Sequence, residues 1–457
     1  MTHSASRRGF LQRTGALSIA GSAAPWALSL AAIGEAAAAD AADYKALVCV
    51  FLYGGNDYGN TLVPYDAASY AAYRTMRPTL AYSQASLAAT VLAPSVALAG
   101  DRQYALAPQL APLLPLFDSG RLGVMLNVGP LVGPTTKAQY LAKSVPLPPK
   151  LFSHNDQQSV WQSSSPEGAT SGWGGRIGDL FESGNGNATF TCVNATGNAV
   201  FLSGRSAVQY QVSTTGPVAI TAVRSALFGS SACSAALQAM IQAPRAHLIE
   251  NEYTRVTKRS IDANAALSAA LAAAPPLATV FPTGNSLADQ LKIVARMIGV
   301  ANALGARRQV FFVGLGGFDN HDGLASVHPG LLTSVANALS AFDAAARELG
   351  VGDKVTTFTA SDFGRTLTAN DGSDHGWGSM HFVLGGAVRG GRFYGTAPVV
   401  ANNGPDDVGQ GRLLPSTAVD QYAATLGAWF GASESELGGV LPNLANYPAT
   451  ARNLGFV

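Results

Sequence analysis

Charged residues are scarce in this sequence, and the shortage argues against several classes of protein. Only 12% of the 457 residues are Asp, Glu, Lys or Arg, and the formal net charge is +1. The lysines and arginines form no run or stripe, so we expect no nucleic-acid partner. Hydrophobic residues make up 47% of the chain, enough for a sizeable core, which argues against wholesale disorder.

Cysteine is also rare, and the three that are present lie far apart. No Cys-x-x-Cys motif occurs, which excludes a thiolate zinc site. Cys49 lies in an apolar run and is expected to be buried. Cys192 and Cys233 could pair in an oxidising compartment, although an odd count and wide spacing give this little support. A P-loop is missing too, because no Gly-Lys-Ser/Thr follows the glycines before Asp57.

The N-terminus has the three parts of an export signal. Arg7 and Arg8 precede an apolar run over 16–33, and four alanines come just before Asp40. Paired arginines are typical of the twin-arginine route, which carries folded proteins. We therefore predict a signal peptide over 1–39 and a mature chain over 40–457 that is periplasmic or secreted and has no transmembrane segment. The alternative is a membrane anchor, which Gly21 and Pro25 weaken.

Unbroken apolar runs alternate with helical patterns along the mature chain. Such runs are typical of strands buried on both faces. A helical pattern over 285–304 and another over 328–349, ended by Gly350, lie between them. This alternation predicts an α/β fold with a mostly parallel central sheet and helices on both faces. The apolar runs are 45–52, 122–128, 309–313, 354–359 and 381–384.

The middle of the chain, over 160–284, has a different composition. It is rich in Gly, Ser, Thr, Asn and Ala, with short strand-like runs near 189–193 and 209–212. A helical stretch follows over about 234–273, before Pro275. We interpret 160–284 as a cap inserted into the α/β domain.

Carboxylates and imidazoles gather where the predicted strands end. Asp57, Asp319 and Asp362 each follow one of these runs closely, and ligands of parallel sheets bind at the carboxyl ends of the strands. Carboxylate oxygen and imidazole nitrogen are ligands for divalent ions, with zinc, manganese and calcium as candidates. The alternative is that these residues are ordinary loop and cap residues. The candidate ligands are Asp57, Asp319, His321, Asp322, Asp362, Asp374, His375 and His381.

Three further residues are candidates for catalysis. Ser153, followed by Asp156, resembles a helix N-cap. A hydroxyl at a helix N-terminus is well placed to attack an anionic ester, although a plain cap is an equal alternative. His154 could be a ligand, a base or a hydrogen-bond partner. Arg365 could hold an anionic substrate or orient Asp362.

Five stretches with a fixed order carry a resemblance to a known family. They are 51–57, 151–158, 317–321, 361–366 and 374–378, and they span nearly the whole mature chain. Together they resemble the bacterial domain-of-unknown-function family fifteen-oh-one. Its members are typically exported and are similar to the alkaline-phosphatase and sulfatase superfamily. The resemblance implies an alkaline-phosphatase-like sheet with metal ligands at the strand ends.

In that superfamily the first strand supplies an aspartate ligand, and the matching residue here is Asp57. The nucleophile lies at the start of a helix, and the residue here that resembles it in position is Ser153. Later strands supply ligands that resemble Asp319, Asp362 and His375. The sequence departs from the superfamily where Gly323 and Phe363 replace histidines, so His321, Asp322, Asp374 or His381 would have to substitute. No Cys-x-Pro-x-Arg motif is present, which excludes the usual sulfatase nucleophile.

These observations lead to two hypotheses of different classes. The first is an exported metal-dependent hydrolase of phosphate or sulfate esters. The second is a non-catalytic exported protein that binds a glycan or another partner on the same scaffold. A single metal that only holds loops together lies between them.

Overall fold

The computed structural model describes residues 44–457. The predicted signal peptide therefore lies outside the described residues. Within 44–457, no helix combines the length and the apolar character needed to cross a membrane.

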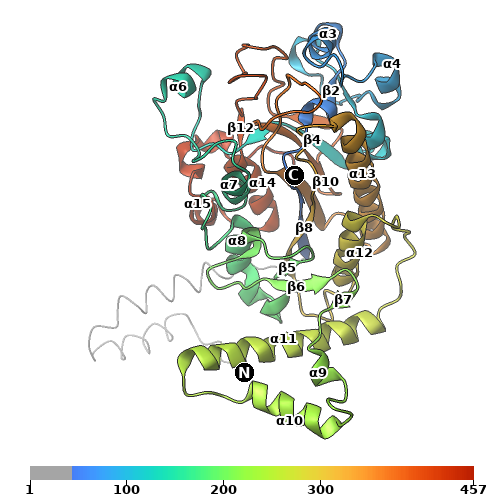
Figure 1. Cartoon of the computed structure of the whole chain (residues 1–457), viewed down its shortest axis with the longest axis vertical. Helices are drawn as coiled ribbons and strands as arrows, with labels where there is room; N and C mark the ends of the chain where they lie inside the picture. Colours follow the sequence, from blue (N-terminus) through green and yellow to red (C-terminus); the bar gives the residue numbers. More distant parts are fainter. Residues whose placement is uncertain (1–43) are drawn as a thin grey trace, which may run out of the picture.

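A ten-stranded sheet runs through the centre of the molecule (Figure 1). The strands β1 (Lys45–Leu52), β8 (Arg308–Leu315) and β9 (Val355–Ser361) form its middle and are parallel, with β1 between the other two. β10 (Ser379–Leu384) is antiparallel to β9 and to β4 (Leu122–Gly129). The sheet order is β11-β4-β10-β9-β1-β8-β5-β6-β7, with β12 paired to β4. The outer strands are β11 (Arg392–Tyr394), β12 (Thr417–Ala418), β5 (Cys192–Asn194), β6 (Tyr210–Ser213) and β7 (Gly216–Pro217).

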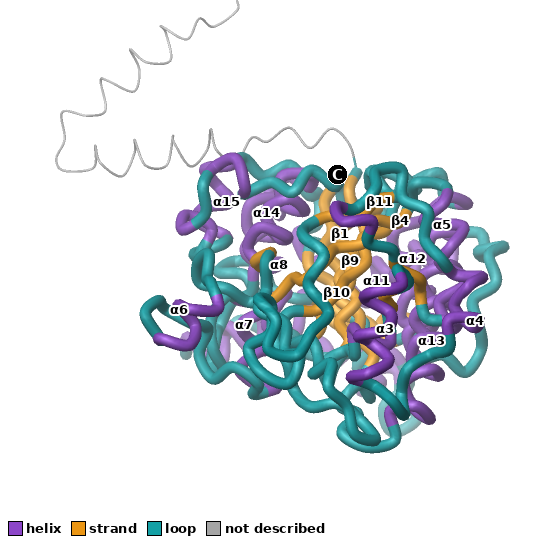
Figure 2. The backbone as a smooth tube through the Cα atoms, turned by 90° about the horizontal axis from the view of Figure 1, so that it is seen from above, coloured by secondary structure: helices purple, strands orange, loops and turns teal. Residues whose placement is uncertain are grey.

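Helices cover both faces of the sheet, so its central strands contact core on both sides (Figure 2). Along β1, Val48 and Val50 pack in the same core as α12 (Ser286–Gly299) and α13 (Leu324–Glu348). Leu47 and Phe51 point the other way, into the core shared with α8 (Trp173–Phe181), α14 (Val419–Phe430) and α15 (Glu434–Val440). This alternation is the two-residue period of a strand. The remaining elements are β2 (Leu62–Pro64), β3 (Tyr104–Leu106), α3 (Ala67–Met76), α4 (Gln84–Leu87), α5 (Leu114–Asp118), α6 (Lys137–Ala142) and α7 (His154–Ser163).

The predicted fold class is confirmed: the sheet is mostly parallel and lies between two helical layers. The run at 381–384 does form a strand, but it is antiparallel to its neighbours, a direction that an apolar run by itself does not reveal.

The region predicted as a cap, 160–284, has two parts. Its first part contributes α8, β5 and β6 to the body, with β5 paired directly to β8. Its second part forms an arm of three helices, α9 (Thr221–Arg224), α10 (Ser231–Gln242) and α11 (Leu248–Ala273), beyond the β5–β6–β7 edge of the sheet (Figure 1).

The disulfide considered between Cys192 and Cys233 is not formed. Cys192 is buried under α8, whereas Cys233 is exposed on α10 in the arm. All three cysteines are free thiols, and Cys49 is buried as expected.

Candidate metal centre

The carboxyl ends of β8 and β9 bring together residues from four distant parts of the sequence. Asp319 lies in the loop after β8, and Asp362 directly follows β9. His154 is the first residue of α7, and His375 lies in the connection between β9 and β10. His321 comes from the same loop as Asp319. Parallel strands deliver their following loops to one edge of the sheet, which is why residues so far apart in sequence meet here.

Three imidazole nitrogens converge on the carboxylate of Asp319. Nε2 of His154 lies 3.3 Å from its Oδ2. Nε2 of His321 and Nε2 of His375 lie 3.1 Å and 3.3 Å from its Oδ1. These two Nε2 atoms are only 3.0 Å from each other. One ligand atom each from His154, Asp319 and His375 can be chosen so that all lie within 4.8 Å of one another.

In each of the three histidines the other ring nitrogen, Nδ1, already faces an oxygen acceptor. Nδ1 of His154 is 2.6 Å from Oδ2 of Asp362. Nδ1 of His375 is 2.7 Å from the carbonyl oxygen of Phe152. Nδ1 of His321 is 3.1 Å from Oδ1 of Asp374. Because carbonyl and carboxylate oxygens only accept, the neutral rings carry their proton on Nδ1 and present a lone pair at Nε2.

This arrangement fits a divalent cation. The Nε2 lone pairs of His154 and His375 and the carboxylate of Asp319 lie within 4.8 Å of one another and repel one another unless a positive charge lies among them, and His321 adjoins this group through His375. Nε2 of His154 is a buried atom that makes no hydrogen bond within the described chain, although Asp319 is near it. Histidines that bind a metal through one nitrogen usually donate the other N–H to a carboxylate or a carbonyl, as all three do here.

Arg365 fixes the position of Asp319. Its Nη1 donates to Oδ1 of Asp319 at 2.7 Å and to the carbonyl of Gly54 at 2.9 Å. The rest of its guanidinium is taken up by Ser373, and the side chain is fully buried. Of the two roles considered for Arg365, the structure shows no pairing with Asp362, because its carboxylate partner is Asp319. No free N–H of Arg365 faces solvent, so direct contact with a substrate is not supported.

The electrostatic environment keeps Asp319 charged and favours a proton on His154. Burial alone would raise the pKa of Asp319, but the hydrogen bond and the charge of Arg365 outweigh it and lower that pKa. The hydrogen bond to Asp362 raises the pKa of His154. Burial lowers the pKa of His375. The charged carboxylate of Asp319 therefore attracts a cation, and a cation that binds Nε2 of His154 would have to displace the proton that this ring favours.

The end of β1 supports this centre through its backbone. Gly54 donates its N–H to Oδ2 of Asp362 at 3.2 Å, and its carbonyl accepts from Arg365. Its φ is +113°, and a Cβ there would lie 2.4 Å from the backbone nitrogen of Asp319. Only glycine allows the two loops to approach this closely. Gln158, one turn after His154 on α7, donates to the same oxygen of Asp362 at 2.8 Å.

Asp57, a predicted ligand, lies outside the cluster in a separate buried ion pair. Arg77 donates to both of its oxygens, at 2.8 Å and 2.6 Å. Oδ2 also accepts from Ser373 at 2.7 Å, and Oδ1 accepts from the backbone of Asn60. Burial alone would raise the pKa of Asp57, but Arg77 lowers it to about 2. With its oxygens occupied, Asp57 is structural, and Ser373 links it to Arg365.

The other predicted ligands divide between the centre and its surroundings. His381 lies in the core against Trp161, away from the cluster, and burial lowers its pKa to about 3. Asp362 and Asp374 contact Nδ1 of His154 and of His321 and so hold these histidines in place. Asp322 is exposed, and no contact among the described residues joins its side chain to the cluster. His328 is buried and bonded to Asn56.

Ser153 occupies the N-cap position of α7, but its hydroxyl does not cap the helix. It donates instead to Oδ2 of Asp156 at 2.9 Å, so the predicted pairing of these two residues is present. No contact among the described side chains links Ser153 to Asp319.

Sequence reasoning missed Arg77, Gln158 and the carbonyl of Phe152. The four-residue spacing of His154 and Gln158 places both on one side of a helix, and this signal could have been used. Arg77 and the Phe152 carbonyl carry no such signal, because only the tertiary structure brings them to Asp57 and His375.

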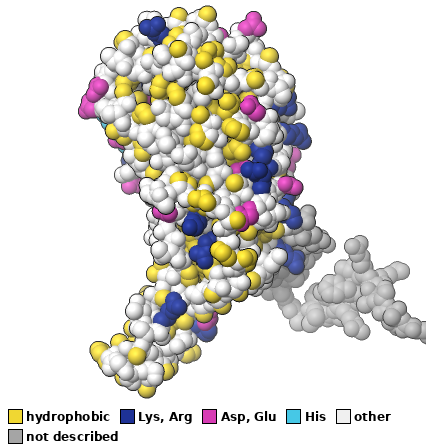
Figure 3. Space-filling view, turned by 90° about the vertical axis from the view of Figure 1, so that its right-hand side faces the viewer, with side chains coloured by type: hydrophobic (Ala, Val, Ile, Leu, Met, Phe, Trp, Pro, Cys, Tyr) yellow, Lys and Arg dark blue, Asp and Glu magenta, His cyan; other side chains and the backbone are white. Residues whose placement is uncertain are grey.

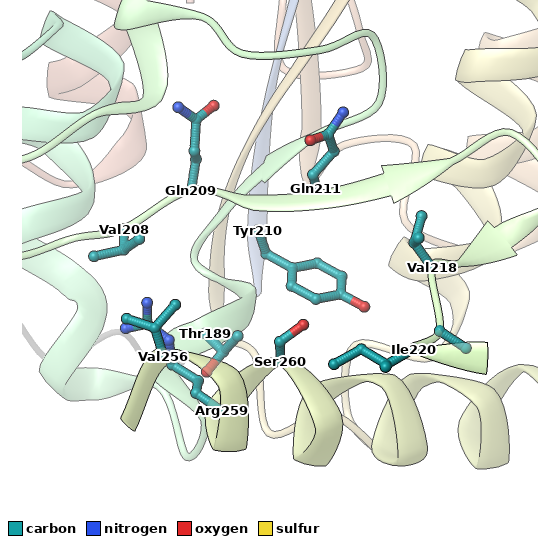
Figure 4. Close-up of a pocket in the computed structure, with 11 residues that line it drawn as sticks. Thr189, Val208, Gln209, Tyr210, Gln211, Val218, Ile220, Val256, Arg259 and Ser260 are labelled. Carbon is teal, nitrogen blue, oxygen red and sulfur yellow. The ribbon is translucent and has the colours of Figure 1, made fainter. Parts of the chain in front are cut away.

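The cluster lies on an open surface rather than in a deep pocket, since the side chains of Asp319 and His321 are both 45% exposed. A distinct hollow of about 460 Å³ lies elsewhere, between β6 and α11 (Figure 4). There Tyr210 points from β6 toward Ser260 of the arm, while Gln209 and Gln211 point to the other side of the strand.

Comparison with known proteins places the chain in a family. Among solved structures, "Crystal structure of Ps i-CgsB in complex with k-i-k-neocarrahexaose" is 9% identical, with a TM-score of 0.36, and the match covers 90% of this chain and 77% of that one. A structure from a study of glycosaminoglycan metabolism by Bacteroides thetaiotaomicron is 8% identical, with a TM-score of 0.34 and coverage of 86% and 74%. Scores this low carry no argument about function. No curated protein matches the sequence. The family model described as "Protein of unknown function (DUF1501)" matches residues 44–436, and the chain belongs to this family.

Proposed function

We propose that this protein is an exported metal-dependent hydrolase of anionic esters, with phosphate and sulfate esters as the candidate substrates. The observation that carries the proposal is the convergence of three Nε2 atoms on Asp319, each histidine being oriented through its Nδ1. Export is supported by the N-terminal sequence, with Arg7 and Arg8 before an apolar run.

In this proposal His154, His375 and Asp319 hold one divalent cation, and His321, whose Nε2 lies 3.0 Å from that of His375, completes the ligand set. A set of three imidazoles and one carboxylate favours zinc or manganese over calcium, which prefers oxygen ligands. The ion would supply a Lewis acid at an accessible edge of the sheet. The protein supplies the rest: Arg365 fixes the carboxylate, and Asp362, Asp374 and the Phe152 carbonyl fix the three rings.

Binding of the anionic part of the substrate falls to Arg412 rather than to Arg365. Arg412 is half-buried beside the cluster, with its Nε bonded to the carbonyl of His375 and its guanidinium over the ring of Phe152. Its Nη1 reaches only the carbonyl of Gly409, at 3.3 Å. Arg412→Gln should therefore raise KM for a charged ester with little change in metal content.

The first test is the metal content of protein purified without a metal-affinity tag, measured by elemental analysis. We expect about one equivalent of zinc or manganese per chain, lost in His375→Ala. The matched control is His247→Ala, an exposed histidine at the start of α11, which should keep the metal. A wild-type chain that stays metal-free after reconstitution contradicts the proposal.

The second test is hydrolysis of a panel of phosphate and sulfate esters by the metal-loaded protein. Activity that disappears in His375→Ala and persists in His247→Ala supports the hydrolase. Ser153→Ala separates two mechanisms, because full activity in this variant excludes the serine as nucleophile.

A non-catalytic binding protein is the second candidate, and one observation favours it. The hydroxyl of Ser153 is bonded to Asp156, and no described contact directs it toward the cluster. A chain that binds metal but leaves every ester intact, while binding a sulfated glycan in a metal-dependent way, would favour this alternative over the hydrolase.

A further inference from the structure

The arm formed by α9, α10 and α11 projects from the body and carries apolar side chains on its surface (Figures 1 and 3). Leu248, Ile249 and Tyr253 on α11 are 82%, 73% and 71% exposed, and Met240 on α10 is 57% exposed. Large exposed apolar side chains that gather on one element mark an interaction surface.

One stripe of α11 runs from the body out onto the arm. In the second half of the helix it consists of Ala263, Leu267 and Leu271, all buried against the body. Continued toward the N-terminus in steps of three and four residues, the same stripe contains Val256, Tyr253 and Ile249. These three are 42%, 71% and 73% exposed, so the face that packs on the core continues past the edge of the body without a partner in the described chain.

The charges beside this stripe indicate what covers it. Glu252 and Arg259 lie on the same flank, seven residues apart, which is one heptad. When two identical helices pair antiparallel about a two-fold axis, residues on the same flank face each other. With the axis between Arg255 and Val256, Glu252 of each copy opposes Arg259 of the other, so two opposite-charge pairs form. In the same register Tyr253 of each copy packs between Val256 and Ser260 of the other.

We propose that two copies of this chain associate through their α11 helices, paired antiparallel along the stripe from Ile249 to Ser260. The hollow of Figure 4 borders this stripe, since Val256 and Ser260 line it opposite Val218 and Ile220. Met240 of α10 borders the other side of the stripe. The α11 helix of the second copy therefore covers an apolar surface formed by α10, α11 and the loop before α9 of the first copy. This inference does not depend on the proposed function.

The test is the molecular mass of the purified chain in solution, measured by sedimentation equilibrium over a range of concentrations. We expect a dimer for the wild type and at least about a 10-fold weaker association for Tyr253→Asp, since an aromatic residue at the centre of an interface contributes strongly. The matched control is Lys258→Ala, an exposed residue on the opposite side of α11, which should dimerise like the wild type. A wild type that remains monomeric at every concentration overturns the proposal.

A charge exchange tests the antiparallel register. Glu252→Arg and Arg259→Glu should each weaken the dimer, because each places like charges opposite each other. The double variant should restore it, and circular dichroism checks that α11 stays helical. Within one chain Glu252 pairs with Arg255 at 2.9 Å, an exposed contact whose loss is expected to have little effect. Single variants that weaken association without rescue in the double variant overturn this register.

Discussion

Asp57 and Asp319 follow adjacent parallel strands, β1 and β8, yet the two carboxylates have opposite surroundings. Asp57 is 1% exposed, and a fully buried arginine, Arg77, occupies both of its oxygens. Asp319 is 45% exposed and shares its oxygens among Arg365 and three histidines. At the first site a guanidinium that is always charged neutralises the aspartate. At the second, the buried guanidinium of Arg365 contacts only Oδ1, so Oδ2 has no arginine partner among the described residues and stays accessible to a cation.

The difference shows that position at a strand end does not by itself make an aspartate a ligand. What decides is whether the buried arginine occupies both carboxylate oxygens, as Arg77 does, or only one, as Arg365 does. Removing either site should therefore have different consequences: loss of stability at Asp57, and loss of metal at Asp319.

The largest effect is expected at the buried pair. Arg77→Met leaves Asp57 charged and buried without its partner, which should lower the free energy of unfolding by about 3–5 kcal/mol. Urea denaturation measures this change. The control is Lys258→Met, which removes an ion pair whose side chains are 56% and 59% exposed and should cost less than about 1 kcal/mol. If the free energy of unfolding fell equally in the two variants, the buried Arg77–Asp57 pair would contribute no more to stability than an exposed ion pair.

Asp319→Asn should have its effect on metal binding instead. The amide keeps the shape of the side chain but loses the negative charge that balances a cation. Zinc affinity should therefore fall more than about 100-fold, a larger loss than is usual for a residue that only contacts a metal ligand. The free energy of unfolding should fall less than in Arg77→Met, because the amide oxygen of Asn can still accept from Arg365 and this position is 45% exposed. Competition with a chromogenic chelator gives the affinity. An unchanged affinity would show that the three histidines do not use this carboxylate.

The two aspartates that hold histidines should differ from each other. Asp362 is fully buried and binds His154 at 2.6 Å, so Asp362→Asn should weaken zinc binding about 10- to 100-fold. Asp374 is 50% exposed and bonds His321 at 3.1 Å, where water can replace it. Asp374→Asn should therefore weaken zinc binding less than about 10-fold, which is below the usual effect of a residue that contacts a metal ligand. The same chelator titration compares them, and a larger loss for Asp374 would contradict the structure.

The smallest effect is a pH dependence from the buried histidines. Burial lowers the pKa of His328 to about 4 and that of His381 to about 3. Below pH 6.5 the unfolded chain binds protons that the folded chain refuses, so stability falls as the pH drops toward 4. Each histidine should contribute about 1.4 kcal/mol per pH unit in this range. His381→Leu should remove one of the two contributions, as unfolding at pH 6 and pH 5 would reveal. An unchanged slope in this variant would mean that His381 takes up its proton without unfolding.

Much of the fold could be predicted because strand and helix patterns are local. The run predicted at 45–52 matches β1 residue for residue, and the run at 354–359 matches β9 to within two residues. The region 160–284 was harder to predict. Strands of three or four residues, such as β5 and β6, are too short to show a clear two-residue period, so the sequence does not distinguish the edge of the sheet from a cap. The direction of β10 also depends on its neighbours, not on its own residues.

The sequence by itself determined the α/β class, the strand ends and the concentration of Asp and His residues after them. These features depend on the hydrophobic period and chemistry of residues that are close together in the sequence. Only the tertiary structure decided that Arg77 neutralises Asp57, that Arg365 holds Asp319, and that the Nε2 atoms of three histidines meet there. The physical reason is that a side chain's role depends on which charges and hydrogen-bond partners reach it, and most of those partners come from distant parts of the chain.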